Sequence, residues 1–151
     1  MNTTLFNNYK KELDDLNESF ESYLNEFEDE ILIESVKLKN ALANQVKLQL
    51  IFETFYSKTK KLQSYIEEEM DNAYSEALTA LTKDNYRDIS ISEAREGAKS
   101  DVTYRKYRRL NIEATGLVND AKAALETVTT RRYVMNSMTN AIVASVESNI
   151  L

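Results

Sequence analysis

The chain has 151 residues, the length of a single domain, with no Pro, Cys or His and only two Gly. Pro and Gly interrupt helices, so their near absence predicts long helices, and no long stretch alternates Val, Ile and Thr as sheet strands do. Without His and Cys the chain lacks disulfides, zinc-binding thiolates and the commonest nucleophile–base pairs. We therefore expect a protein without enzymatic activity, metal or cofactor.

The formal net charge of −6 is unevenly distributed along the chain. Residues 1–34 hold two Lys and ten acids, a net charge of −8, whereas residues 35–151 hold seventeen Lys or Arg and fifteen acids, a net charge of +2. A local basic surface can bind a polyanion even when the whole chain is acidic. No apolar run approaches the ~20 residues that cross a bilayer, and the N-terminus lacks an apolar signal core, so we expect no membrane contact and a cytoplasmic location.

The first predicted element is an acidic heptad helix within residues 1–32. Its apolar residues alternate spacings of three and four on one seam: Phe6, Tyr9, Leu13, Leu16, Phe20, Tyr23 and Phe27. Asp and Glu cover most of the remaining surface. Aromatic side chains are bulky for a tight two-stranded coil, so this seam packs against the rest of the chain or a second chain, or it docks a basic partner.

A second helix is predicted from about Glu34 to about Leu81, with Ser57-Lys58 as a candidate kink. Residues at helical spacing form its apolar stripe: Leu38, Leu42, Val46, Leu50, Phe55, Leu62, Ile66 and Met70, followed by a shorter stripe of Ala73, Ala77, Leu78 and Leu81. Residues 82–88 are polar and are predicted to form a loop. Ser90 and Glu93 then have the spacing of a capping box, which predicts a helix start.

The last region, from about Ser92 to about Ser145, is predicted to be one long helix. Its heptad-like stripe comprises Leu110, Ala114, Leu117, Ala121, Ala124, Val128, Met135, Met138 and Ile142, widened by Val118 and Leu125. A solitary helix cannot bury such a stripe, so it must fold back on the earlier helices or meet another subunit. The predicted fold class is therefore all-α, with long helices packed as a hairpin or bundle through coiled-coil-like seams, in an oligomer.

A basic and aromatic stretch is the main candidate for nucleic-acid binding. It comprises Lys99, Tyr104, Arg105, Lys106, Tyr107, Arg108 and Arg109. Arg105, Arg108 and Arg109 share one helix face, where cations can follow a phosphate backbone, and the tyrosine rings could stack on bases of a single strand. The alternative is a solvated helix face whose cations pair with acids such as Asp101 and Glu113.

Arg131 and Arg132 are a second candidate site. Arg131 falls on the apolar stripe, where a charge is costly unless it is paired or faces water. The alternatives are a buried ion pair and a groove or pore lined by Arg from several subunits. The run Glu67-Glu68-Glu69 is interpreted as a solvated face, because three adjacent helical residues cannot all ligate one ion, and no Gly-rich phosphate loop is present.

The stretch Ile33–Leu48 resembles the opening helix of the phage UvsY family of recombination mediators. The family has an acidic residue after an Ile, a Lys-Leu pair, an Ala-Asn pair and a Val-x-Leu, which are here Glu34, Lys37-Leu38, Ala43-Asn44 and Val46 with Leu48. Further similarity lies at Ile66-Glu67 and at Thr130-Arg131-Arg132-Tyr133. The resemblance covers roughly Ile33 to Ala144 in the same order, so we expect a mediator-like domain over residues 33–151 after the acidic helix of residues 1–32.

This resemblance implies a helical, ring-like homo-oligomer whose C-terminal helix supplies subunit contacts. It implies binding to single-stranded DNA, to a recombinase and to single-strand binding protein, so that the recombinase replaces that protein in the host-cell cytoplasm. Two features depart from the family. A basic Leu-x-Ala-Arg-Leu-like stretch is here Tyr74-Ser-Glu-Ala-Leu78, so we expect DNA contacts at Lys99, Arg105, Lys106, Arg108 and Arg109 instead. The acidic helix before Glu34 is also longer than the family implies.

Three other functions remain as alternatives. A purely structural or adaptor protein would use its heptads for assembly alone and would not bind DNA at modest salt. An acidic DNA mimic would need a track of surface carboxylates, for which residues 1–34 are the only candidate. An enzyme ranks last, because His, Cys and a phosphate loop are missing.

Overall fold

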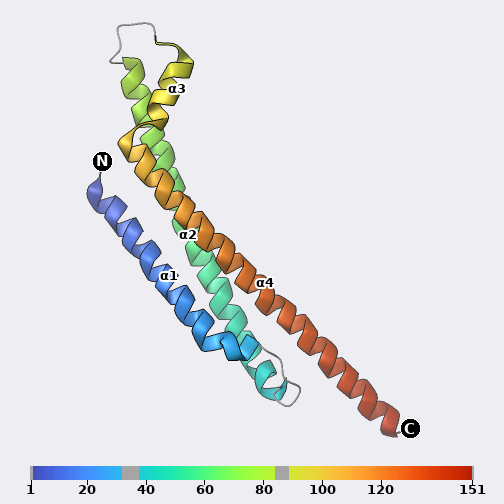
Figure 1. The fold of residues 1–151 in the computed structure, drawn as a ribbon. Helices are drawn as coiled ribbons and strands as arrows, with labels where there is room; N and C mark the ends of the chain where they lie inside the picture. Colours follow the sequence, from blue (N-terminus) through green and yellow to red (C-terminus); the bar gives the residue numbers. More distant parts are fainter. Residues whose placement is uncertain (1, 32–37, 84–88, 151) are drawn as a thin grey trace. The chain divides into compact units, whose positions relative to one another are not determined.

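The structure is a computed structural model that describes residues 2–31, 38–83 and 89–150. Within these ranges the chain forms four helices and no strand: α1 (Thr3–Ile31), α2 (Leu38–Lys83), α3 (Ile91–Lys99) and α4 (Val102–Ile150) (Figure 1). The all-α fold class is thereby confirmed. The chain divides into two compact units, the first unit comprising residues 1–17 and 58–118 and the second unit comprising residues 18–57 and 119–151. Three of the helices therefore contribute a segment to each unit.

In the first unit, segments of α1, α2 and α4 and the short helix α3 all bury apolar side chains. These are Leu13 of α1, Leu62, Ile66 and Ala73 of α2, Ala94 and Ala98 of α3, and Tyr107, Leu110, Ala114 and Leu117 of α4. Here α2 and α4 run antiparallel, since Gln63 donates a hydrogen bond to Asn111 at 3.1 Å and Tyr74 contacts Tyr104. The α1 segment is held to α4 by an edge-to-face contact of Phe6 with Tyr107, whose ring centroids lie 5.3 Å apart.

The short helix α3 begins at the predicted capping box. The Ser90 side chain accepts the backbone N–H of Glu93 at 3.2 Å, and the Glu93 carboxylate accepts the backbone N–H of Ser90 at 3.0 Å. These reciprocal bonds satisfy two N–H groups that a helix start leaves without partners. The predicted start near residue 92 is confirmed.

The prediction of one continuous helix from about Ser92 to about Ser145 was wrong. The chain breaks at Ser100, which ends α3, and at Asp101, whose carboxylate accepts the Tyr104 N–H at 3.0 Å and caps the start of α4. Gly97 allows α3 to lie close to α2, because a Cβ at this position would be 2.8 Å from Cδ1 of Leu81. A short polar side chain that can cap a new helix therefore outweighed the helical propensity of its neighbours.

The second unit has its own apolar interior between α2 and α4. Leu48 and Phe52 of α2 pack with Val128 of α4, and Ala41 packs with Met135. On the α1 side, Phe20 stacks on Phe55 at 5.3 Å between ring centroids, and Tyr23 meets the same ring edge-on. The heptad seam of α1 therefore packs against its own chain in both units, which was one of the three alternatives. Phe27 lies among residues whose side chains the structure does not describe.

The predicted apolar stripe of α2 was wrong at three positions of the second unit and right at Phe55. Leu42, Val46 and Leu50 are exposed, whereas Phe55 is buried together with Ala41, Gln45, Leu48 and Phe52. The exposed and the buried series share the helical period, so the sequence pattern does not distinguish them, and the large ring of Phe52 reaches the interior. The helix α2 is not broken at Ser57-Lys58. Thr82 and Lys83, which were predicted to begin the loop, instead end α2, where the Thr82 hydroxyl donates to the carbonyl of Leu78 at 3.1 Å. The side chain of Leu38 and the rest of the predicted loop, residues 84–88, lie outside what the structure describes.

The predicted stripe of α4 is confirmed from Leu110 to Met138 and fails beyond it. Leu110, Ala114, Leu117, Ala121, Val128 and Met135 are buried, whereas Ile142 is 52% exposed and every side chain from residue 140 to residue 150 is exposed. None of the described helices has an apolar stretch long enough to span a membrane.

Candidate nucleic-acid interface

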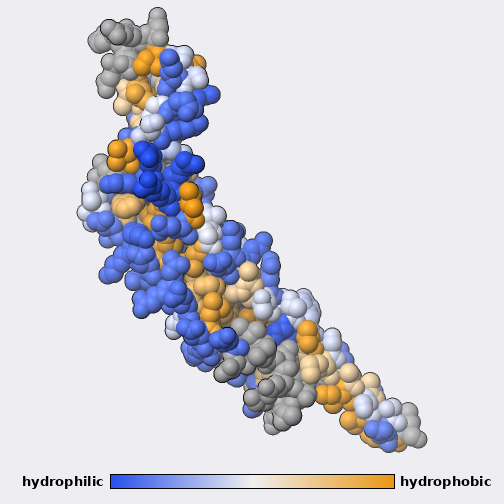
Figure 2. Space-filling model, viewed as in Figure 1, coloured by the Kyte–Doolittle hydropathy of each residue, from blue (hydrophilic) through white to orange (hydrophobic). Residues whose placement is uncertain are grey.

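Four cations near the start of α4 form the surface that we call the basic face: Arg105, Lys106, Arg108 and Arg109. All four are exposed, and the buried residues Tyr107 and Leu110 of the same turns point to the opposite side of the helix. Strongly hydrophilic side chains gather over the first turns of α4 in the space-filling view (Figure 2). The helical period places Arg105, Arg108 and Arg109 together, so this part of the predicted site is assembled as expected.

The two acids that the sequence offered as partners of the basic face, Asp101 and Glu113, make their contacts elsewhere. Asp101 caps α4 through the N–H of Tyr104, and Glu113 accepts a hydrogen bond from Lys10 of α1 at 3.0 Å. Among the described residues, none of the four cations of the basic face forms an ion pair. The basic face therefore carries net positive charge into solvent, although the chain as a whole is acidic.

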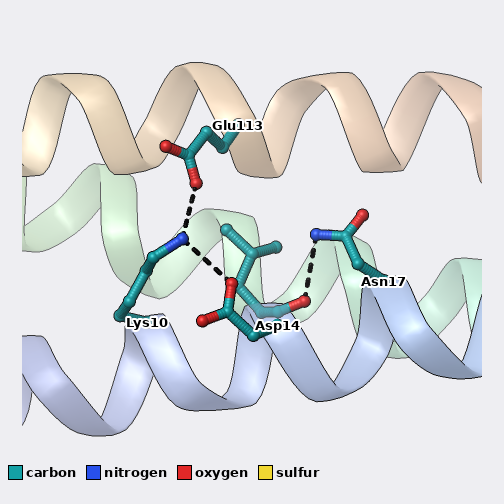
Figure 3. Close-up of polar contacts among 5 residues, drawn as sticks. Lys10, Asp14, Asn17 and Glu113 are labelled. Atoms are coloured by element: carbon teal, nitrogen blue, oxygen red, sulfur yellow. Dashed lines mark hydrogen bonds and ion pairs between the residues drawn. The ribbon is translucent and has the colours of Figure 1, made fainter.

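The ion pair of Lys10 explains why Glu113 is not available to the arginines. The Lys10 ammonium lies between the carboxylates of Asp14, at 2.9 Å on the same helix, and Glu113, at 3.0 Å on α4 (Figure 3). Hydrogen bonds to Asp14 and then Glu113 raise the pKa of Lys10 above its ordinary value. This acidic helix thus contributes a cation, not a carboxylate, to its described ion pair with α4.

An aromatic pair lies beside the basic face. The half-buried rings of Tyr74 from α2 and Tyr104 from α4 have centroids 5.5 Å apart at an interplanar angle of 57°. Lys99 is exposed near them, and its hydrogen bond from Nζ to Glu96 at 3.0 Å raises its pKa. Sequence reasoning predicted Tyr104 and Lys99 but missed Tyr74, because only the antiparallel packing of α2 on α4 brings residues thirty positions apart together.

Tyr107 does not belong to the exposed site. Its side chain is 3% exposed and packs against Phe6, so its ring cannot stack on a base without unfolding of this contact. Burial raises the pKa of the Tyr107 hydroxyl, and the negative charge of Glu69 adds to this effect. The prediction of two stacking rings in this stretch is corrected to Tyr104 alone, because Tyr107 falls on the opposite side of α4.

Arg131 and Arg132, the second predicted site, belong to the second unit and differ from each other. Arg131 is 4% exposed and its Nη1 donates a hydrogen bond to Oε1 of Gln45 at 2.7 Å. Gln45 in turn donates from Nε2 to the backbone carbonyl of Val128 at 2.9 Å, so the pair bridges α2 and α4. Arg132 is exposed, with its guanidinium 5.2 Å from the centroid of the Tyr133 ring. Arg131 therefore faces a glutamine of its own chain, and its burial removes it from an open DNA surface.

The second unit also has an open groove of about 510 Å³ between α2 and α4. It is lined by Tyr56, Lys122, Leu125, Glu126, Thr129 and Thr130. Its cation Lys122 faces Glu126 at 3.9 Å, so the groove offers less net positive charge than the basic face. In the described part of the chain, no group of three or more acids is arranged to hold a metal ion.

Comparisons of this chain with protein-family models, with curated proteins and with solved structures find no match. The functional argument therefore depends on the geometry of the basic face and its aromatic neighbours.

Proposed function

We propose that this chain is a non-enzymatic protein that binds single-stranded DNA through the basic face of α4 and acts as a recombination mediator. The observation that carries the proposal is the set of four exposed cations without an ion pair in the described structure, beside acids that are occupied elsewhere. Leaving four cations unneutralised in a chain with a net charge of −6 is expected where a polyanion supplies the missing charge.

The helix geometry favours contact with a phosphate backbone. Arg105 and Arg109 are one turn apart, about 6 Å along the axis, and Arg108 lies beside them. Guanidinium groups bind phosphate oxygens in a bidentate manner, and exposed ones can adjust to a flexible strand. Because the cations follow one side of a helix without an accompanying set of base-reading side chains, we expect binding without strong sequence preference.

The preference for single strands is proposed from the pair Tyr74 and Tyr104. A single strand exposes the faces of its bases, and stacking on an aromatic ring contributes about 1–3 kcal/mol per base. Duplex DNA hides these faces, so the tyrosines could contribute little to duplex binding. Tyr74→Ser with Tyr104→Ser should therefore weaken single-strand binding more than duplex binding.

The mediator role is proposed from the resemblance to the UvsY family. In that role the protein would form a homo-oligomer, contact a recombinase and single-strand binding protein, and help the recombinase take the place of that protein on the strand. Any nucleotide hydrolysis would belong to the recombinase. The basic face supplies the DNA contact that this role requires.

Fluorescence anisotropy with a labelled single-stranded oligonucleotide tests the DNA contact. Arg105→Glu with Arg108→Glu should reduce affinity at low salt by about 100-fold or more and should lower the salt slope by about 2. The matched control is Lys58→Glu with Lys61→Glu, which makes the same change in charge on exposed positions of α2. Equal effects of both pairs, or an unchanged salt slope in the arginine variant, would contradict the proposal.

A structural or adaptor protein is the second candidate, and the exposed apolar side chains of the second unit favour it. Val46 is 76% exposed and Ile150 is 78% exposed, as expected of surfaces that contact another protein. This candidate predicts assembly without DNA binding. The absence of oligonucleotide binding by the unaltered protein at low salt would select it over the mediator.

A further inference from the structure

An aliphatic side chain lies among the arginines of the basic face. Ile112 of α4 is 62% exposed, and it comes four residues after Arg108 and three after Arg109. The helical period therefore places its side chain beside both guanidinium groups. Figure 2 shows apolar surface directly beside the strongly hydrophilic first turns of α4. A single exposed Ile is ordinary on a protein surface, so the groups around it decide what it can bind.

Tyr104, Arg108 and Ile112 form one row along α4, at positions i, i+4 and i+8. The row presents an aromatic ring, a guanidinium group and an aliphatic side chain in succession. It is about 12 Å long, a length that about three or four stacked nucleotides cover at about 3.4 Å each. A strand whose phosphate is held by Arg108 therefore has one base within reach of Tyr104 and another within reach of Ile112.

The next position of this row is Gly116, which leaves the helix surface open beside Ile112. A Cβ at Gly116 would meet no described atom within 4 Å, and the φ of this glycine is not positive. Neither the packing of the described chain nor the backbone conformation therefore requires a glycine here. Gly destabilises a helix interior relative to Ala, and a common reason for its use is the close approach of a ligand to the backbone. The row thus ends in an open place for a base.

The group of a DNA base that suits Ile112 is a C5 methyl group. Among the groups at the edges of DNA bases, the thymine methyl is the apolar one, and aliphatic side chains contact it in protein–DNA complexes. Its contact with Ile112 removes apolar surface of both partners from water. Uracil has the same hydrogen-bonding groups as thymine without the methyl group, so it gains nothing from this contact.

We propose that Ile112 binds the C5 methyl group of a pyrimidine, which is thymine in ordinary DNA, while Arg108 and Arg109 hold the adjoining phosphates. The inference rests on the proposed function, because it assigns a subsite of the same DNA-binding surface. One methyl group contributes about threefold in affinity, so thymine is favoured without being required. The same contact favours DNA over an RNA strand of equivalent sequence, in which uracil replaces thymine.

Fluorescence anisotropy with two labelled oligonucleotides of equal length, one of deoxythymidine and one of deoxyuridine, tests the methyl contact. The unaltered chain should bind the thymidine strand about threefold more tightly, and Ile112→Ala should reduce this ratio to about one. The matched control is Ile91→Ala, which removes the same side chain at a 72% exposed position of α3, outside the basic face, and should keep the ratio. Equal affinities in the unaltered chain, or a ratio that persists in Ile112→Ala, would overturn the proposal.

A second pair of oligonucleotides, of 5-methyldeoxycytidine and of deoxycytidine, separates the methyl group from the rest of thymine. The methylated strand should again bind about threefold more tightly, and equal affinities for this pair would count against the proposal. Because the methyl contact is apolar, the ratio should stay the same at raised salt, although both affinities fall. A ratio that disappears with salt would show that charge, not the methyl contact, produces it.

The tyrosine ring needs its own control, because stacking also depends on the base. Tyr104→Ser should weaken binding of the thymidine and deoxyuridine strands by similar factors and preserve their ratio. Loss of the ratio in this variant would assign the methyl group to Tyr104 and overturn the role of Ile112.

The same titrations distinguish failure of this inference from failure of the proposed function. Tight but equal binding of the thymidine and deoxyuridine strands would remove the methyl contact and leave the DNA contact of the basic face intact. Binding of neither strand at low salt would remove both proposals.

Discussion

The two units distribute charge and apolar surface in opposite ways. In the first unit, Leu62, Ile66 and Leu110 are buried and the arginines of the basic face lie in solvent. In the second unit, the guanidinium of Arg131 is buried against Gln45, while Ile142, Val146 and Ile150 are exposed. Both arrangements occur along the same continuous helix α4.

This difference indicates two kinds of surface. Exposed cations without ion pairs in the described structure suit a polyanion. They can neutralise its phosphates and release the counterions that these phosphates hold. Exposed branched aliphatic side chains suit a protein contact, because their burial is favourable wherever the partner is also apolar. If the proposed function holds, one helix serves nucleic-acid binding in the first unit and a protein contact in the second.

The largest expected effect tests whether apolar packing holds the second unit together. Phe52→Ala removes a ring that is fully buried among Leu48, Val128 and their neighbours, so it should lower the free energy of unfolding by about 4 kcal/mol. Ile142→Ala, at an exposed position of the same unit, should change it by less than about 0.5 kcal/mol at concentrations where the chain is monomeric. Urea denaturation measures both, and similar losses would refute the assignment of Ile142 to the surface.

Loss of the hydrogen bond between Gln45 and Arg131 in the second unit should lower the free energy of unfolding by a smaller amount. Gln45→Leu removes the acceptor for Nη1 of Arg131 and the hydrogen bond to the Val128 carbonyl, at an expected cost of about 2–3 kcal/mol. Urea denaturation measures the loss, and a change of less than about 0.5 kcal/mol would contradict a stabilising role of this hydrogen bond.

A substitution on the open side of α4 in the first unit should be stabilising. Gly116 does not have a positive φ, and a Cβ there would meet no atom within 4 Å, so Gly116→Ala should raise the free energy of unfolding by about 1 kcal/mol. Gly97→Ala should raise the free energy of unfolding by less than Gly116→Ala, because the new Cβ would have to displace the Leu81 side chain. Thermal denaturation compares them, and a larger gain at Gly97 would contradict the packing of α3.

The smallest expected effect is a difference between the two units in how their stability changes at alkaline pH. Burial raises the pKa of Tyr107 and of Tyr9, and hydrogen bonds raise that of Lys10, all in the first unit. Each group holds its proton more tightly in the folded chain, so its contribution is present below the unfolded pKa and is lost as the pH rises above about 10. Amide exchange at rising pH should therefore show protection lost in the first unit.

Tyr107→Phe keeps the ring contact with Phe6 and removes one of these protons, so it should reduce the pH dependence of stability above about pH 10. Tyr133→Phe, at an exposed ring of the second unit, is the matched control. An identical alkaline response in the two variants would show that Tyr107 does not contribute.

Several features of this protein were determined by its sequence alone. The near absence of Gly and Pro produced long helices, the spacing of Ser90 and Glu93 placed the start of α3, and the heptad seam of α1 identified the side that Leu13 buries. The basic face followed from the spacing of Arg105, Arg108 and Arg109. All of these features depend on interactions between residues a few positions apart, so the local sequence is enough to predict them.

The tertiary structure decided which of several equivalent sides each helix buries. The series with Leu42 and the series with Leu48 have the same period on α2, and only contact with α4 selects the second. The same kind of contact buries Tyr107, pairs Tyr104 with Tyr74, and brings Gln45 within hydrogen-bond distance of Arg131. These outcomes depend on residues far apart in the chain, because helical periodicity defines the sides of a helix but the neighbouring helix determines which side is covered.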